Sequence, residues 1–169
     1  KEIDDDLAEL DSLIEELLVY HRVGSSRPDA AKEILRVQDE LENLAQRTAR
    51  FRPEIVVRVV GNERADSQVL ANRDLFQRAL QNLLINAVRH ARASVTLEIA
   101  RRDAQVLVAV CDDGPGIPPA DRDRIFEPFT RLDGSRSRDT GGTGLGLAIV
   151  RRIVDGQGGS VLVDDAPAG

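Results

Sequence analysis

A carboxylate followed closely by two glycines carries the first chemical signal in this sequence. Residues 112–117, the first glycine segment, read Asp-Asp-Gly-Pro-Gly-Ile and follow an apolar run, 106–111, which predicts a buried strand. Asp112 is therefore an acceptor beside backbone with almost no side-chain bulk. It could accept a hydrogen bond from the exocyclic amine of adenine, whereas guanine would present a second acceptor there. This segment could therefore hold a base, although it does not by itself predict a binding site.

A second glycine segment lies at residues 142–147 and reads Gly-Thr-Gly-Leu-Gly-Leu at the start of an apolar helical pattern. Bare N–H groups and the helix dipole favour an anion at such a helix start, so Gly142, Gly144 and Gly146 are candidates for phosphate contacts. Either segment alone is a structural turn about as often as a ligand site. Only the two together predict a nucleotide site.

Four polar residues fall on one side of a predicted helix over residues 74–91, for which Asp74 is the expected N-cap. They are Asn82, Asn86, Arg89 and His90. Side-chain amides offer neutral oxygens, which suit a hard cation that obtains most of its charge compensation from phosphates. An ordinary polar helix face is the alternative, and on its own the more common one.

The order of these segments, with Phe-Glu-Pro-Phe-Thr-Arg at 126–131 between them, resembles the ATP-binding catalytic domain of sensor histidine kinases. That domain belongs to a superfamily shared with gyrase, MutL and the ninety-kilodalton heat-shock chaperones. The resemblance covers about residues 33–165, and residues 126–131 point to the kinase branch. It implies an α+β fold, a two-layer α/β sandwich in which a mixed, mostly antiparallel sheet of about five strands packs on three helices.

The resemblance also implies ATP and Mg²⁺ as cofactors. Asn86 would ligate Mg²⁺, Asp112 would bind adenine, Ile117 would line the base pocket, and Thr143 would lie near the base. The family usually has Lys-Tyr where this chain has Arg89-His90. Arg89 still offers a donor to phosphate, and His90 can still contact the ribose or the phosphates. The predicted nucleotide contacts are Asn82, Asn86, Arg89, His90, Asp112, Gly114, Gly116, Ile117, Gly142, Thr143, Gly144, Leu145 and Gly146, with Arg131 a further candidate for the terminal phosphate.

Residues 1–23 carry apolar residues at alternating spacings of four and three, which predicts a coiled-coil-like helix. The heptad face comprises Ile3, Leu7, Leu10, Ile14, Leu17 and His21. Such a helix needs a partner, either a second copy or a helix outside this chain, unless it packs on its own domain. The resemblance implies the second helix of the hairpin that dimerises and presents the phosphoacceptor. Expected domains are therefore 1–24 (hairpin helix), 25–32 (linker) and 33–169 (ATP-binding domain).

The remaining pattern predicts further elements. Residues 33–37 fit a strand or a helix, and the resemblance favours the strand. A polar segment, 118–141, predicts a mobile lid in which Phe126 and Phe129 pack on the core or the helical bundle. Other expected elements are strands at 55–60, 68–71, 94–99, 106–111 and 160–163, a helix from Asp39 to about Phe51 begun by a capping box, and a helix at 145–155.

Composition limits the partners and the location. A net charge of −6 over 169 residues argues against nucleic acid or a membrane surface as partner. Cys111 is the only cysteine, so an intramolecular disulfide is excluded. No stretch of about 20 apolar residues is present. We expect the chain itself to be soluble. The resemblance implies that it is a piece of a longer membrane-bound sensor, on the cytoplasmic side of the bacterial inner membrane.

The phosphoacceptor is missing from the pattern. The two histidines, His21 and His90, are followed by Arg22 and Ala91 rather than by the acidic residue that the resemblance implies. We therefore expect the chain to supply Mg-ATP within a homodimer, with the acceptor histidine elsewhere and a response-regulator aspartate as final acceptor. A nucleotide-gated interaction module, or a degenerate kinase that binds ATP without transfer, is the alternative. The heptad helix and residues 126–129 argue against a protein-serine kinase of the same superfamily.

Overall fold

The computed structural model describes residues 2–25, 31–61, 67–132 and 143–165. The chain forms two compact units, a larger one of residues 31–118 with 164–169 and a smaller one of residues 1–30 with 119–163. Among the helices of the described ranges, none is both long and apolar enough to cross a membrane.

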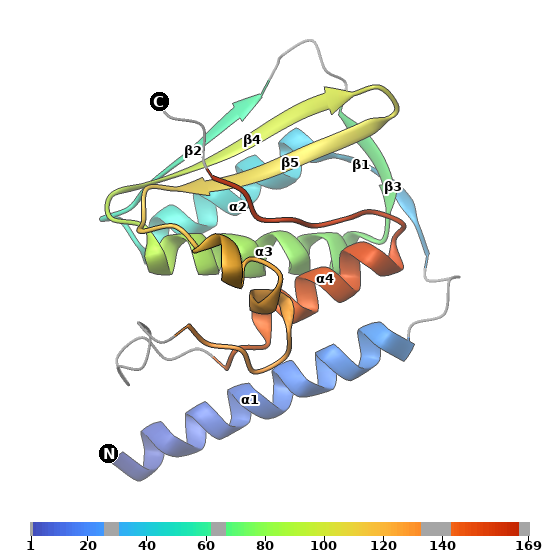
Figure 1. The fold of residues 1–169 in the computed structure, drawn as a ribbon. Coiled ribbons are helices and arrows are strands. Elements are labelled where there is room, and N and C mark those ends of the chain that lie inside the picture. The colour runs from blue at the N-terminus through green and yellow to red at the C-terminus, as the bar shows by residue number, and fades with distance from the viewer. Residues whose placement is uncertain (1, 26–30, 62–66, 133–142, 166–169) are drawn as a thin grey trace. The chain divides into compact units, whose positions relative to one another are not determined.

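In the described part of the larger unit, five strands form two sheets (Figure 1). They are β1 (Glu33–Arg36), β2 (Val56–Gly61), β3 (Gln68–Ala71), β4 (Ser94–Arg102) and β5 (Gln105–Asp112). β1 pairs antiparallel with β3, and the second sheet has the order β2-β4-β5, with β2 parallel and β5 antiparallel to β4. The expected mixed, mostly antiparallel pairing is confirmed, and so is the strand at 33–36.

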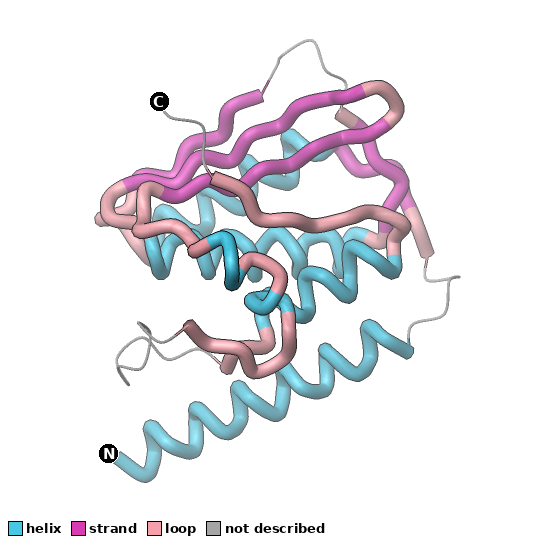
Figure 2. Tube along the Cα trace, in the orientation of Figure 1, coloured by secondary structure: helices cyan, strands magenta, loops and turns pink. Residues whose placement is uncertain are grey.

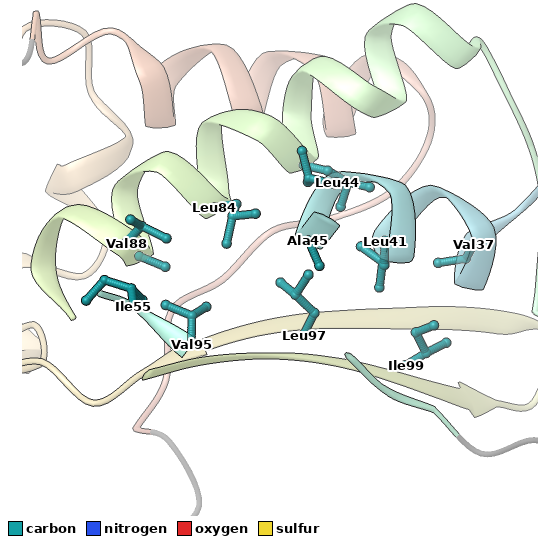
Figure 3. Close-up of a cluster of buried hydrophobic side chains, with 12 residues drawn as sticks. Val37, Leu41, Leu44, Ala45, Ile55, Leu84, Val88, Val95, Leu97 and Ile99 are labelled. Carbon is teal, nitrogen blue, oxygen red and sulfur yellow. The ribbon is translucent and has the colours of Figure 1, made fainter. Parts of the chain in front are cut away.

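Two helices of the larger unit, α2 (Val37–Phe51) and α3 (Arg73–His90), cover one face of the β2-β4-β5 sheet (Figure 1). The side chains of β4 alternate in burial, because successive residues of a strand point to opposite faces. Figure 3 shows the resulting core between the helices and the sheet. Its buried residues are Val37, Leu41, Leu44, Ala45, Ile55, Leu80, Leu84, Ala87, Val88, Val95, Leu97 and Ile99.

The predicted start of α2 at Asp39 is wrong by two residues. The helix begins at Val37, and its N-cap residue, Arg36, makes no side-chain capping bond. Val37 is fully buried, and its N–H donates to the carbonyl of Ser67 at 2.9 Å. Burial of Val37 therefore sets the start of the helix, while Asp39 lies in the first turn, where a carboxylate is favourable for the helix dipole.

The predicted cap of α3 is also wrong. Asn72 is the N-cap, and its Oδ1 accepts a hydrogen bond from the N–H of Leu75 at 3.0 Å. Asp74 lies one residue inside the helix. Both residue types are good caps, so the choice depends on where β3 ends at Ala71.

The buried carboxylate of Glu40 ties α3 to α2. Gln77 donates to it at 2.7 Å, and Arg73 donates to it as well. Arg73 also donates to Glu33 at 2.8 Å, and this hydrogen bond lowers the pKa of Glu33. A buried charge is tolerated because it is paired and hydrogen-bonded, and these bonds fix the N-terminal end of α3.

The smaller unit contains two helices that lie side by side, α1 (Glu2–Ser25) and α4 (Gly146–Gly156) (Figure 1). The guanidinium of Arg152 stacks over the ring of Tyr20 at 4.5 Å from its centroid, so the contact between the helices is partly a cation–π interaction. Both helices confirm the prediction to within two residues. Figure 2 shows most of residues 113–132 as loop, interrupted by two short helices, η1 (Pro119–Asp121) and η2 (Arg124–Phe126).

The predicted strand at residues 160–163 is wrong. The described residues 159–165 have no regular secondary structure and form no ladder with a strand of the described chain. Leu162 is 74% exposed. The sequence Val-Leu-Val has strand composition, but strand formation depends on a neighbour that satisfies the backbone, and composition does not supply one.

Leu41→Ala should lower the free energy of unfolding by about 2–5 kcal/mol, because Leu41 is fully buried between α2 and the sheet. Leu162→Ala removes the same atoms from an exposed position, so its effect should stay within about 0.5 kcal/mol. Urea denaturation followed by circular dichroism measures both values. Similar losses for the two variants would contradict the assigned core.

Candidate nucleotide-binding site

The polar face of α3 carries four of the predicted residues. Asn82 and Asn86 are half-buried, and Arg89 and His90 are exposed in the last turn. The opposite face of the helix lies in the core, so the amides are held on a helix that cannot rotate. The side chain of Asn86 makes no recorded hydrogen bond to another described residue, so its oxygen is available to a ligand.

The first glycine segment follows β5 directly. Asp112, half-buried, is the last residue of β5 and pairs with Val95 of β4. Its Oδ1 accepts a hydrogen bond from the N–H of Gly114 at 2.9 Å. For the second oxygen, Oδ2, the described residues provide no recorded partner. The carboxylate is thus anchored by one oxygen and can accept a donor with the other.

Gly114 and Gly116 are needed for different reasons. A Cβ on Gly114 would lie 2.5 Å from Oδ1 of Asp112 and 2.5 Å from the carbonyl oxygen of His90. Gly116 has a φ of +72° and open space around its Cα, so the backbone conformation is what requires glycine there. The close approach at Gly114 brings the first glycine segment against the C-terminal end of α3.

Asp113 has a role that the sequence did not reveal. It is exposed, but its carboxylate accepts hydrogen bonds from the backbone N–H groups of Arg92, Ala93 and Ser94. Those backbone bonds lower the pKa of Asp113 to about 2, although desolvation opposes them. No local pattern could indicate this, because the partners lie 19 to 21 residues away.

The smaller unit holds the second glycine segment. Gly144 has a φ of +74°, its carbonyl accepts from the N–H of Phe129 at 2.9 Å, and a Cβ there would lie 2.8 Å from the carbonyl carbon of Phe129. The N–H of Leu145 donates to Oγ1 of Thr143 at 3.2 Å, Leu145 is fully buried, and α4 begins at Gly146. The predicted helix start after glycines is confirmed. Gly142 lies outside the described residues.

Thr143 also contacts α1. Its hydroxyl donates a hydrogen bond to the carboxylate of Glu16. In this structure the hydroxyl that was predicted to lie near the base is therefore occupied by a helix residue of the same unit.

The two phenylalanines of 126–131 differ from one another. Phe126 is buried, and the guanidinium of Arg151 lies 4.3 Å from its ring centroid. Phe129 is 60% exposed and has a φ of +63°, so the prediction that its ring packs is wrong. The backbone of Phe129, rather than its ring, holds the loop to Gly144. Arg131 is exposed, and residues 133–142 of the predicted lid lie outside the described residues.

The structure thus gathers the predicted residues in two groups. The larger unit holds Asn82, Asn86, Arg89, His90, Asp112, Gly114, Gly116 and Ile117. The smaller unit holds Thr143, Gly144, Leu145, Gly146 and Arg131. No group of three or more His, Cys, Asp or Glu side chains that could hold a metal ion occurs in the ranges that the structure describes.

A protein-family model described as "Histidine kinase-, DNA gyrase B-, and HSP90-like ATPase" matches residues 71–169. The chain belongs to this family. Sensor protein RstB of Escherichia coli (strain K12) is 39% identical over 171 residues, which cover 97% of this chain and 38% of RstB. This ATPase-family chain therefore spans well under half the length of that relative.

Solved structures agree with the family assignment. The mycobacterial sensor histidine kinase MprB has a TM-score of 0.69 at 30% identity, covering 79% of this chain and 85% of that one. Full-length ShkA, solved in complex with AMPPNP, has a TM-score of 0.78 at 29% identity, covering 93% of this chain and 33% of that one. The α+β fold of the chain is thus the fold of histidine kinase ATP-binding domains.

Gly114→Ala should abolish ATP binding and lower stability, because its Cβ would displace either the Asp112 carboxylate or the His90 carbonyl. Gly156→Ala is the matched control. Its Cβ would meet nothing within 4 Å at the end of α4, so it should bind ATP like the parent. Calorimetry with ATP and thermal denaturation of both variants measure this. Parental affinity in Gly114→Ala would contradict the close approach.

Proposed function

We propose that this chain is the ATP-binding catalytic part of a two-component sensor histidine kinase. It binds Mg-ATP and presents the γ-phosphoryl group to a histidine outside this chain, from which the group passes to a response-regulator aspartate. Family membership and the sensor-kinase relatives support this proposal. The observation that carries it is the half-buried Asp112 carboxylate, tied to Gly114 by one oxygen and open at the other.

The residues present fit ATP. Asp112 would accept the adenine amine, and the half-buried Ile117 would line the base pocket, where Gly116 leaves space. The N–H groups at the start of α4, preceded by Gly142 and Gly144, would hold phosphates. Arg89 and Arg131 are exposed cations that would add charge to phosphate binding. Bound ATP supplies the phosphoryl group, and the chain binds and orients it.

Asn86 would ligate Mg²⁺, with Asn82 supporting the same edge one helical turn earlier. Asn86 fits this role because its side chain offers a neutral amide oxygen that binds no other described residue. The helix that carries it is held by its buried face. Mg²⁺ requires oxygen ligands and takes several of them from substrate phosphates. The ion would neutralise phosphate charge.

The acceptor histidine would come from another part of the complete kinase. His21 and His90 are both exposed, but neither is followed by a carboxylate that could act as a base. By itself the chain should therefore bind ATP without transferring phosphate to its own histidines. The complete protein would lie at the cytoplasmic side of the bacterial inner membrane and bind a response-regulator receiver domain.

The helix α1 would form the homodimer contact, together with a helix outside this chain. Leu10, Ile14 and Leu17, the described leucine and isoleucine residues of the heptad face, are 54%, 53% and 49% exposed. Glu16 and Tyr20, which contact Thr143 and Arg152 of the same unit, are not residues of the heptad face. An apolar heptad face that its own domain leaves exposed is typical of a coiled-coil or bundle partner.

Calorimetry with Mg-ATP, Mg-GTP and the Asp112→Asn variant tests the nucleotide site. The parent should bind ATP at least about tenfold more tightly than GTP, because guanine sets a carbonyl against the carboxylate. Asp112→Asn should lose ATP affinity by about 10- to 100-fold, since hydrogen bonds to a charged group contribute about 1.5–3 kcal/mol. If the parent binds neither nucleotide, the proposal is wrong.

Ile14→Asp should weaken self-association of the chain, because a carboxylate would enter the middle of the heptad face. Glu15→Asp is the control, since it places aspartate at the next, exposed position of the same helix. Sedimentation velocity over a range of concentrations, on a chain extended by the preceding helix, measures the effect. An extended parent that stays monomeric at every concentration would count against dimerisation through α1.

One observation favours the alternative, a nucleotide-gated interaction module. The hydrogen bond from Thr143 to Glu16 links the second glycine segment to α1, so occupancy of the segment could change the helix without any transfer. Phosphoryl transfer can be measured in a longer chain that includes the preceding helix. If that chain binds ATP but transfers no phosphoryl group, the alternative is correct.

A further inference from the structure

We propose that Asp113 is a positioning residue for adenine recognition: its carboxylate, bound to the turn of residues 92–94, aims the neighbouring Asp112 at the base. This inference rests on the proposed function, because it assumes that the first glycine segment binds adenine. Asp113 itself would not touch the nucleotide.

The bonds of Asp113 converge on one short turn between α3 and β4. Oδ1 accepts from the N–H of Arg92 at 2.7 Å and from that of Ala93 at 3.1 Å. Oδ2 accepts from the N–H of Ala93 and of Ser94, each at 3.1 Å, and from the Ser94 hydroxyl at 3.2 Å. The backbone N–H of Asp113 donates to the carbonyl of Ser94 at 3.3 Å. Three consecutive amides thus hold a single carboxylate.

This attachment determines where Asp112 points. Asp112 is the last residue of β5, and Asp113 follows it directly. Because the side chain and the N–H of Asp113 are both bound to the turn and to Ser94, the peptide that joins it to Asp112 is held in place, and with it the direction of the Asp112 side chain. The next residue, Gly114, is held as well, because its N–H binds Asp112 and its Cα lies against the His90 carbonyl. The chain on either side of Asp113 is therefore held at two points, the turn of residues 92–94 and the last residue of α3.

The chemistry of the contact requires a carboxylate. Three N–H groups and one hydroxyl all donate to Asp113, and a carboxylate has enough lone pairs to accept every one of them. An asparagine would turn its NH₂ group toward one set of donors. The bonds also favour the ionised form of Asp113, whose pKa falls to about 2. Its negative charge is matched by amide dipoles, so it lies beside Asp112 without needing a cation.

Asp113→Asn tests the inference, with Asp103→Asn as matched control. Asp103 is an exposed aspartate at the other end of the same hairpin, and its φ of +54° is one that asparagine tolerates. Calorimetry should give the ratio of GTP to ATP dissociation constants at a temperature where circular dichroism shows each variant folded. NMR should follow the amide of Gly114, which reports its bond to Asp112.

We expect Asp113→Asn to weaken ATP binding about tenfold, to reduce the discrimination against GTP, and to shift the Gly114 amide resonance. Asp103→Asn should match the parent in all three. Lower stability with unchanged nucleotide discrimination and an unchanged Gly114 resonance would show that Asp113 is only a cap of the turn, and would overturn the inference.

Two further outcomes separate this inference from the proposed function. If the parent binds ATP and Asp112→Asn does not, but Asp113→Asn binds like the parent, the proposed function stands and the inference is wrong. If the parent binds no nucleotide, both are wrong. Should Asp113→Asn fail to fold, Ser94→Ala removes only the hydroxyl bond, and it should still lower the discrimination about two- to threefold. Parental discrimination in Ser94→Ala would then overturn the inference.

Discussion

The packing of α3 on the three-stranded sheet is the constraint on which the larger half of the candidate site depends. Leu80, Leu84 and Val88 lie in the core, so the helix has no freedom to rotate about its axis. Asn82 and Asn86 are then directed away from the core by the same 3.6-residue period that buries the leucines. Packing of the opposite helix face thus determines on which side of α3 the two amides lie.

Each unit contains a close approach of backbone at a glycine of its candidate segment. In the larger unit Gly114 lies against the His90 carbonyl, and in the smaller unit Gly144 lies against Phe129. Both contacts join segments that are distant in sequence, and both exclude a Cβ. The glycines therefore serve tertiary packing as well as any contact with ligand. Phe129 has a positive φ although it is not glycine, and its side chain is largely exposed.

The smaller unit combines two kinds of interaction that meet at α4. The buried residues Ala148, Ile149 and Ile153 form its apolar face. Arg151 and Arg152 use their planar guanidinium groups on Phe126 and Tyr20, which joins η2 and α1 to the same helix. Thr143 belongs both to the predicted phosphate-binding segment and to the contact with α1. In this unit, the segment expected to bind phosphate is connected directly to the helix expected to dimerise.

Periodicity and glycine spacing are local properties that a chain carries into any environment, so the sequence alone predicted most helices and strands and suggested the candidate residues. The α+β class followed from the resemblance to a known family. The errors concerned features that depend on neighbours in space. The starts of α2 and α3 moved because Val37 is buried and because β3 ends at Ala71, and residues 160–163 form no strand because no neighbour pairs with them. Only the tertiary structure revealed the role of Asp113, since its partners are about twenty residues away and a carboxylate's choice among distant amides is made by folding.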